Sequence, residues 1–208
     1  MALAEPTPSV TADDTAGSVA ATGAGLPVFS VLDIETSGLS TRRHRILQIA
    51  VARFEAGRIV GEWSSLVSLR WPWQRVGPRR VHNITRAQLR GAPRGADVLG
   101  EFAERTAGTV LVAHNMGFDW PFIERAARRG RVAVAPDGRL CTLSLSRRLD
   151  PDRQLSHRLG DLCERYDIVN ARPHDAVHDA RATALLLPHL LAAHGVTSGA
   201  DLADLYER

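Results

Sequence analysis

Four carboxylates and one histidine stand in three short segments that lie far apart in the chain. Asp33 and Glu35 are two residues apart, Asp119 comes much later, and His174 precedes Asp179 by five residues. Carboxylate oxygens are the ligands that Mg²⁺ prefers in proteins, and an imidazole can accept a proton from water near neutral pH. Together these side chains could hold two divalent ions and activate a water molecule, which are the requirements of a magnesium-dependent nuclease.

The first two carboxylates end an apolar run that is typical of a β-strand. Side chains two residues apart on a strand project from the same face, so Asp33 and Glu35 should point the same way. A charge at the end of a buried run is costly without a partner, and a metal ion would remove that cost. Gly38 then lets the chain turn away. Taken alone, the pair could equally be a polar strand end at the protein surface.

The other acidic residues fall at predicted helix starts. Asp119 opens the helix that follows His114 and Asn115, where the helix dipole alone would favour a carboxylate. Asp179 lies one turn into the last long helix, for which Asp175 is expected to be only the N-cap. The second and third acidic segments therefore have a structural interpretation as well as a chemical one.

As an ordered set, these segments resemble a known enzyme family. The strings are Asp33-Ile34-Glu35-Thr36-Ser37-Gly38-Leu39, His114-Asn115-Met116-Gly117-Phe118-Asp119 and His174-Asp175-Ala176-Val177-His178-Asp179. They resemble the DEDDh 3′–5′ exonucleases, a DnaQ-like family that includes the proofreading epsilon subunit of bacterial DNA polymerase III. Further similar stretches are Val81-His82-Asn83-Ile84-Thr85 and Leu159-x-x-Leu162-Cys163, and the resemblance spans about residues 28–195. One departure is His178, which occupies a position that is often acidic.

The resemblance implies a fold and a set of roles. The implied fold is α/β and ribonuclease H-like, with a mixed five-stranded sheet flanked by helices. Two Mg²⁺ or Mn²⁺ ions would be bound by Asp33, Glu35, Asp119 and Asp179, and His174 would be the general base. The implied residues around the substrate terminus are Thr36, Gly38, Leu39, His82, Ile84, Asn115 and Phe118. Of these, Asn115 and Phe118 are expected mainly to shape their loop, with Phe118 in the core.

The implied reaction is metal-dependent hydrolysis of terminal phosphodiester bonds, which releases nucleoside 5′-monophosphates. The expected substrate is DNA with a single-stranded or frayed 3′ end, because the Asp33-Ile34-Glu35-Thr36 string resembles DNA proofreading enzymes. An exonuclease acting on RNA or short oligonucleotides, and a non-catalytic nucleic-acid-binding module of the same fold, stay open as alternatives. Association with a DNA polymerase is also open. A zinc hydrolase built on His174 and His178 is a weaker hypothesis, because H-D-A-V-H lacks the glutamate of H-E-x-x-H.

The remaining sequence predicts the elements that would position these residues. Strands are expected at 28–34, 46–54 and 59–67, with a turn at 55–58, and a buried strand at 109–113 should run parallel to the first. Asp97 is expected to cap a helix that ends near Ala107. The next helix should hold Pro121 in its first turn and stop at Gly130.

Three further helices are expected in the second half of the chain. Thr142 should cap a short one, and another should cover Leu159 to Tyr166. The last should run from about Asp175 to His194, with a kink or break at Pro188.

Composition separates the N-terminal segment from the rest of the chain. Residues 1–27 are rich in Ala, Thr, Gly and Pro, and are expected to be a disordered tail before one exonuclease domain at 28–208. The chain has 208 residues and a formal net charge of +3, but the first 27 residues contain three acids and no base, so the remainder carries about +6. The body therefore suits a polyanionic partner without requiring one.

Cellular location is predicted from what the sequence contains. No apolar run approaches the ~20 residues of a membrane span, and the first residues do not resemble a signal peptide. Cys141 and Cys163 are too few for a disulfide framework and are expected to be free thiols in a cytoplasmic protein.

All 26 basic residues, excluding histidines, are arginine, and several fall in expected loops. A guanidinium suits phosphate, although GC-rich codon usage would also produce this bias. The candidates for gripping a phosphate backbone are Arg42, Arg43, Arg45, Arg70, Arg75, Arg79 and Arg80, with a solvated basic surface as the alternative. Trp71 and Trp73 could stack on bases or anchor their loop to the core.

Overall fold

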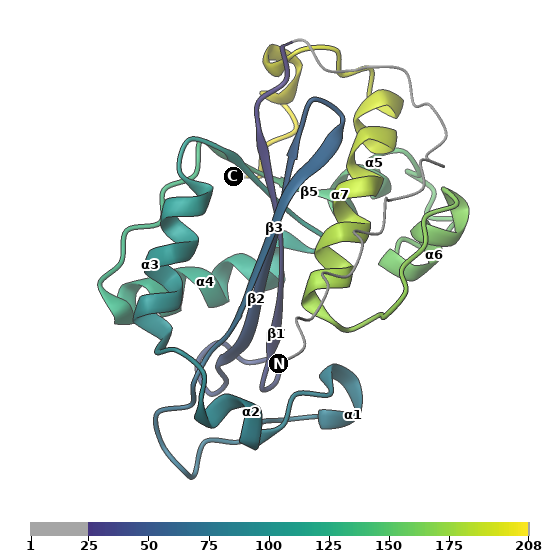
Figure 1. Ribbon diagram of the computed structural model, residues 1–208. Helices are drawn as coiled ribbons and strands as arrows, with labels where there is room; N and C mark the ends of the chain where they lie inside the picture. Colours follow the sequence, from purple (N-terminus) through teal and green to yellow (C-terminus); the bar gives the residue numbers. More distant parts are fainter. Residues whose placement is uncertain (1–24, 208) are drawn as a thin grey trace, which may run out of the picture.

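A computed structural model describes residues 25–207, which form a mixed five-stranded sheet with helices on both faces (Figure 1). The strand order is β3-β2-β1-β4-β5. The antiparallel part joins β1 (Phe29–Thr36), β2 (Ile46–Glu55) and β3 (Arg58–Leu66). β4 (Val110–Ala113) pairs parallel to β1, and β5 (Gly138–Cys141) pairs parallel to β4. The expected mixed five-stranded α/β sheet is confirmed.

Two groups of helices cover opposite faces of the sheet (Figure 1). One face carries α3 (Gly95–Thr106) and α4 (Met116–Gly130). The other carries α5 (Thr142–Arg148), α6 (Leu159–Arg165) and α7 (Ala176–Ala193). The shorter elements are α1 (Arg79–His82), α2 (Arg86–Arg90) and a 3₁₀ turn at Gly199–Leu202.

The alternation of side chains along β1 decides which face carries the first carboxylates. Val31 is buried in the core under α5, α6 and α7, whereas Leu32 and Ile34 are buried in the core under α3 and α4. Because successive side chains alternate across a strand, Asp33 and Glu35 share the face of Val31. The first two carboxylates therefore face α7.

Small side chains bring the start of α7 close to this part of the sheet. Ala50 on β2 is buried against Ala176 and Ala180 of the helix, and a methyl group on each side allows a short approach. Farther along, Arg181 donates two hydrogen bonds to the Glu62 carboxylate on β3, at 2.8 and 2.6 Å. This planar two-point contact fixes the helix over the antiparallel strands.

The four strands expected from the sequence are confirmed within one or two residues at their ends, but β5 was not identified. Its four residues are too few to show a period, and only its pairing with β4 makes it a strand. The helix α2 was also missed, although a signal was present. Thr85 and Gln88 form a capping box at its start, a pattern that can be read from sequence.

Three details of the predicted helices were wrong. Arg94 rather than Asp97 is the N-cap of α3, and Thr142 is the first residue of α5 instead of its cap. Pro121 lies in the second turn of α4, because left-handed Asn115 starts this helix earlier than expected. The expected start of α7 is confirmed, since Asp175 is its N-cap and accepts a hydrogen bond from the Val177 N–H. The helix continues through Pro188 without a break.

Most of the segment expected to be a disordered tail, residues 1–24, lies outside the described residues. Of the rest, the Gly25 carbonyl accepts a hydrogen bond from the Gly199 N–H, and Leu26 packs on the core under α7. None of the helices within residues 25–207 is long and apolar enough to cross a membrane.

Candidate active site

Three of the four carboxylates meet where β1 ends beside the start of α7. Asp33 and Glu35 on β1 and Asp179 on α7 each offer an oxygen, and these oxygens all lie within 4.8 Å of one another. No other group of three or more potential metal ligands is present within residues 25–207. The alternation of side chains along β1 places Asp33 and Glu35 on one face, and the close approach of α7 brings Asp179 to them.

Asp119 approaches the same place from α4. It lies in the first turn of that helix, directly after β4, and its side chain is buried with 3% of its surface exposed. After burial itself, the Asp119 charge is the largest cause that raises the pKa of Asp33. Asp119 thus completes the acidic centre electrostatically, although its oxygens are outside the 4.8 Å group.

Burial and mutual repulsion make these carboxylates hard to ionise together. The pKa of Asp33 is raised well above its ordinary value by burial and by the charges of Asp119, Asp179 and Glu35. Burial and the nearby Asp179 raise the pKa of Glu35 to about 8. No arginine or histidine within the described chain forms an ion pair with any of the four carboxylates. A divalent cation would supply the missing positive charge, so the donor set fits a metal.

Asp179 is held in place by two donors. The Asn170 side-chain amide donates to one carboxylate oxygen at 2.6 Å, and the His174 backbone N–H donates to the other at 2.9 Å. His174 has a left-handed backbone, with φ of 65°, which lets the loop before α7 curl over the carboxylate, and its side chain is exposed. The sequence analysis missed Asn170, because nothing in the motif marks a residue that lies nine positions before its partner.

Replacing Asn170 should weaken metal binding without removing a ligand. We expect Asn170→Ala to lower the affinity for Mn²⁺ by about 10–100-fold, the usual effect of losing a group that orients a metal ligand. Calorimetric titration of the metal-free protein would measure it. Gln154→Ala, which removes an exposed amide on another loop, is the control. Equal affinities of the wild type and Asn170→Ala would contradict the assigned orienting role.

The raised pKa values predict how the folding stability of the metal-free protein depends on pH. In the unfolded chain Glu35 loses its proton near pH 4.5, whereas in the folded chain its pKa is about 8. The folded state therefore holds more protons between these values, and its stability should fall as the pH rises through this window. Thermal unfolding in EDTA would measure the trend, and Glu35→Gln should flatten it. A midpoint that rises over the same window only in the wild type would contradict the prediction.

Three predicted substrate residues lie at the end of β1 and on the turn that follows it. The buried Thr36 hydroxyl donates to the Gly38 carbonyl at 2.9 Å, which stabilises the turn. Gly38 has φ of 148°, a backbone conformation that favours glycine, and a Cβ there would lie 2.6 Å from the His44 ring, so the ring would have to move to accept a side chain. Leu39 is 84% exposed at the tip. The structure thus leaves Leu39 free to contact a ligand and gives Thr36 and Gly38 roles in building the turn.

The other four predicted substrate residues are less accessible or lie on other elements. Ile84 is buried in a small core cluster, and His82 is also buried, where its Nδ1 accepts the Ile84 N–H at 3.0 Å. Asn115 is exposed with a left-handed backbone at the start of α4. Phe118 packs on the core, with its ring 5.2 Å from that of Phe122. These positions agree with the expected loop-shaping parts of Asn115 and Phe118.

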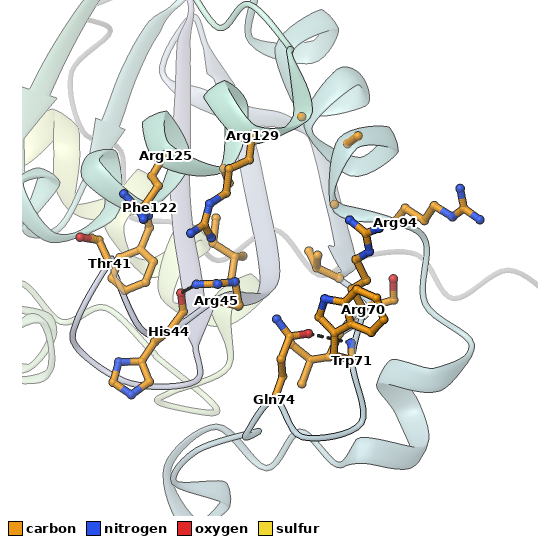
Figure 2. A pocket seen from close by; sticks show the side chains of 18 residues that line it. Thr41, His44, Arg45, Arg70, Trp71, Gln74, Arg94, Phe122, Arg125 and Arg129 are labelled. Carbon is orange, nitrogen blue, oxygen red and sulfur yellow. Dashed lines mark hydrogen bonds between the residues drawn. The ribbon is translucent and has the colours of Figure 1, made fainter.

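Neither tryptophan of the basic loop anchors it to the core. Trp71 and Trp73 stack on each other, with ring centroids 5.0 Å apart, and Trp73 is 74% exposed. Of the arginines expected to grip phosphate, Arg45 and Arg70 line a pocket together with arginines from other elements (Figure 2). Sequence reasoning missed the arginines on α4.

The histidines proposed for a zinc site do not form one. The His178 Nε2 accepts a hydrogen bond from the Arg172 guanidinium at 3.0 Å, and the acidic group of the described residues contains no histidine. The spacing of His174 and His178 is therefore incidental to metal binding.

A mixed sheet of this strand order, with carboxylates gathered where β1, α4 and α7 meet, defines a nuclease of the ribonuclease H-like class. Comparisons with known proteins agree. The exonuclease family matches residues 30–187, and the chain belongs to this family. Divalent metal use and nucleic-acid binding follow from that membership.

Relatives and solved structures extend the comparison. The PolC-type DNA polymerase III of Bacillus subtilis is 33% identical over 164 residues, which are 78% of this chain and 11% of that protein. The chain thus spans only a small part of the curated relatives it matches. The structure of Exonuclease X in complex with 5′ overhanging duplex DNA is 27% identical, with a TM-score of 0.65, and the match covers 85% of this chain and 98% of that one.

A more distant structure shares the fold. The nuclease domain of 3′hExo, a DEDDh family member bound to rAMP, is 14% identical, with a TM-score of 0.71 over 84% of this chain and 96% of that one.

Proposed function

We propose that this chain is a 3′–5′ exonuclease that hydrolyses terminal phosphodiester bonds of DNA and releases nucleoside 5′-monophosphates. The observation that carries the proposal is the acidic centre, in which oxygens of Asp33, Glu35 and Asp179 lie within 4.8 Å beside the buried Asp119. The similarity to Exonuclease X, whose structure holds duplex DNA with a 5′ overhang and hence a recessed 3′ end, supports DNA as the substrate.

In this proposal the four carboxylates hold two Mg²⁺ or Mn²⁺ ions. When bound, such ions neutralise charge at the phosphate and lower the pKa of a coordinated water. Asn170 and the His174 backbone N–H keep Asp179 oriented toward the centre. The exposed His174 imidazole takes the proton from the attacking water and passes it to solvent. The carboxylates repel one another in the metal-free centre, and bound cations would relieve this repulsion. This relief favours metal binding.

Degradation of DNA labelled at its 5′ end tests the proposal. With Mg²⁺ or Mn²⁺ we expect a ladder of products that shorten from the 3′ end, release of mononucleotides, and no reaction in EDTA. Matched RNA and duplex DNA with a recessed 3′ end would rank the substrates. Internal cleavage, or shortening from the 5′ end, would contradict the proposal, and faster decay of RNA would favour the ribonuclease alternative. Binding of DNA without any hydrolysis would favour a non-catalytic module.

The cellular setting is also a proposal. Similarity to PolC-type polymerases supports association with a DNA polymerase, which co-purification with the replicative polymerase would test. The free, buried Cys141 and Cys163 support a cytoplasmic location, which cell fractionation would test. Residues 28–208 are proposed to form one exonuclease domain, with limited proteolysis as the test.

A further inference from the structure

A basic pocket lies on the face of the sheet opposite the carboxylates. Its volume is about 850 Å³, and it is lined by residues of α4, the start of β2, the start of α3 and the segment after β3 (Figure 2). Since α3 and α4 cover one face while Asp33 and Glu35 point to the other, this pocket is separate from the acidic centre. We call it the arginine pocket.

The arginine pocket concentrates positive charge without any acidic side chain in its wall. Five arginines line it, namely Arg45, Arg70, Arg94, Arg125 and Arg129. His44 is a further lining residue. Figure 2 shows Arg45 and Arg129 extending toward one another, whereas Arg94 reaches outward. None of these arginines forms an ion pair with a carboxylate within the described part of the chain.

The arginines at the centre of the pocket have no carboxylate partner among residues 25–207, although Arg45 donates a hydrogen bond to the His44 carbonyl at 2.7 Å. The Nε atom of Arg125 is buried and has no hydrogen-bond partner among the residues that the structure describes. Burial, together with the charges of Arg45 and Arg125, lowers the pKa of Arg129, and burial with Arg125 does the same for Arg45. Guanidiniums held together against their repulsion, with one donor unsatisfied, are the features of an anion site.

A second hollow connects this pocket to the turn beside the acidic centre. It has a volume of about 520 Å³ and shares His44, Arg45, Trp71 and Gln74 with the first. At its other side it reaches Ser37, two residues after Glu35, which is a proposed metal ligand. Further lining residues are Arg43, Arg75 and the exposed Trp73. Basic and aromatic side chains thus form a continuous track from the end of β1 to the arginine pocket.

We propose that the arginine pocket binds backbone phosphates of the polynucleotide substrate, at nucleotides beyond those at the acidic centre. This inference rests on the proposed function, because the same polymer would occupy both places. Repeated phosphates match the guanidiniums, and the flat exposed face of Trp73 beside them suits a base. An acidic protein segment would match the charge but would not use the tryptophan face.

Binding of fluorescent oligothymidylates of increasing length, measured by anisotropy in EDTA, tests the pocket without catalysis. Affinity should increase with length in the wild type. The double variant Arg125→Gln/Arg129→Gln should lose at least about tenfold affinity for the long oligomer, and its salt dependence should weaken by about 1.4 in slope for two lost phosphate contacts. Trp73→Ala, at an exposed position that cannot disturb the core, should lose about fivefold or more.

The control removes the same charge elsewhere. Arg58→Gln/Arg128→Gln replaces an exposed arginine at the far end of the β2–β3 hairpin and one on α4 that pairs with Glu124. We expect this variant to bind the long oligomer as the wild type does. Similar losses in both double variants would overturn the proposal, as would affinity that does not depend on oligomer length. Polyglutamate that competes as well as the oligomer would assign the pocket to an acidic protein instead.

A kinetic readout separates this proposal from the proposed function. In the Arg125→Gln/Arg129→Gln variant, the ratio of kcat/KM for a long oligomer to kcat/KM for a dinucleotide should fall about tenfold. An unchanged ratio would overturn the role of the pocket while leaving the exonuclease intact. Absence of hydrolysis by the wild type would instead reject the proposed function, and the binding measurement would still decide the pocket.

Discussion

Asp33→Asn is expected to reduce the exonuclease rate by at least about 10³-fold while making the metal-free protein more stable. The rate should fall because the variant loses a metal ligand and with it the charge stabilisation at the phosphate. The stability should rise because burial and four neighbouring carboxylates raise the pKa of Asp33, so that its ionised form is unfavourable in the folded protein. About 1 kcal/mol of relief would raise Tm by about 2–4 °C in a domain of this size.

Thermal unfolding in EDTA and steady-state hydrolysis at saturating Mn²⁺ would measure the two effects of Asp33→Asn. The two measurements are informative because Tm should rise while the hydrolysis rate falls. Substitution of a residue that only supports the fold would lower both. Added Mn²⁺ should raise the Tm of the wild type more than that of the variant. A variant with lower Tm in EDTA would contradict the electrostatic account, and one with near-normal activity would contradict the role of Asp33 in metal binding.

His174→Ala is expected to reduce the rate by about 10²-fold or more and to leave metal affinity unchanged. A general base contributes about 10²–10⁴-fold, and that contribution would go with the imidazole. The contact of this residue with Asp179 is made by its backbone N–H, at 2.9 Å, and alanine keeps that donor. The side chain is exposed, so its removal should leave no cavity.

Titration with Mn²⁺ and the pH–rate profile would measure the His174 prediction. His178→Ala is the matched control, because that imidazole accepts a hydrogen bond from Arg172 and belongs to no metal group of the described residues. We expect the control to keep its rate. Loss of Mn²⁺ affinity in His174→Ala would show that the imidazole supports the metal centre, and normal turnover would contradict its assignment as the base.

The Asn170 prediction separates ligand orientation from ligand identity. Asn170→Ala should weaken the metal by less than Asp33→Asn does, because all four carboxylates stay in place. Metal affinity should therefore decrease from wild type to Asn170→Ala and again to Asp33→Asn. This order would distinguish a residue that orients a metal ligand from a residue that is one.

Local sequence was sufficient for several features that lie within one element. The spacing of Asp33 and Glu35 placed both on one face of β1, and Asp175 marked the start of α7. The same local reasoning failed at Pro121, because the left-handed Asn115 that starts α4 leaves no distinct signal in the sequence. It also failed at β5, whose four residues are a strand only because β4 lies beside them.

The residue types and the order of the acidic motifs were determined by the sequence alone, and with them the class of chemistry. Only the tertiary structure decided that Asp179 reaches the strand carboxylates, that Asp119 lies near enough to repel Asp33, and that Asn170 and the His174 backbone orient Asp179. It alone also gathered arginines of α4 and of the β1–β2 turn around one pocket. The physical reason is that spacing along an element follows from local backbone geometry, whereas meetings between elements depend on how buried side chains such as Ala50 and Ala176 let them approach.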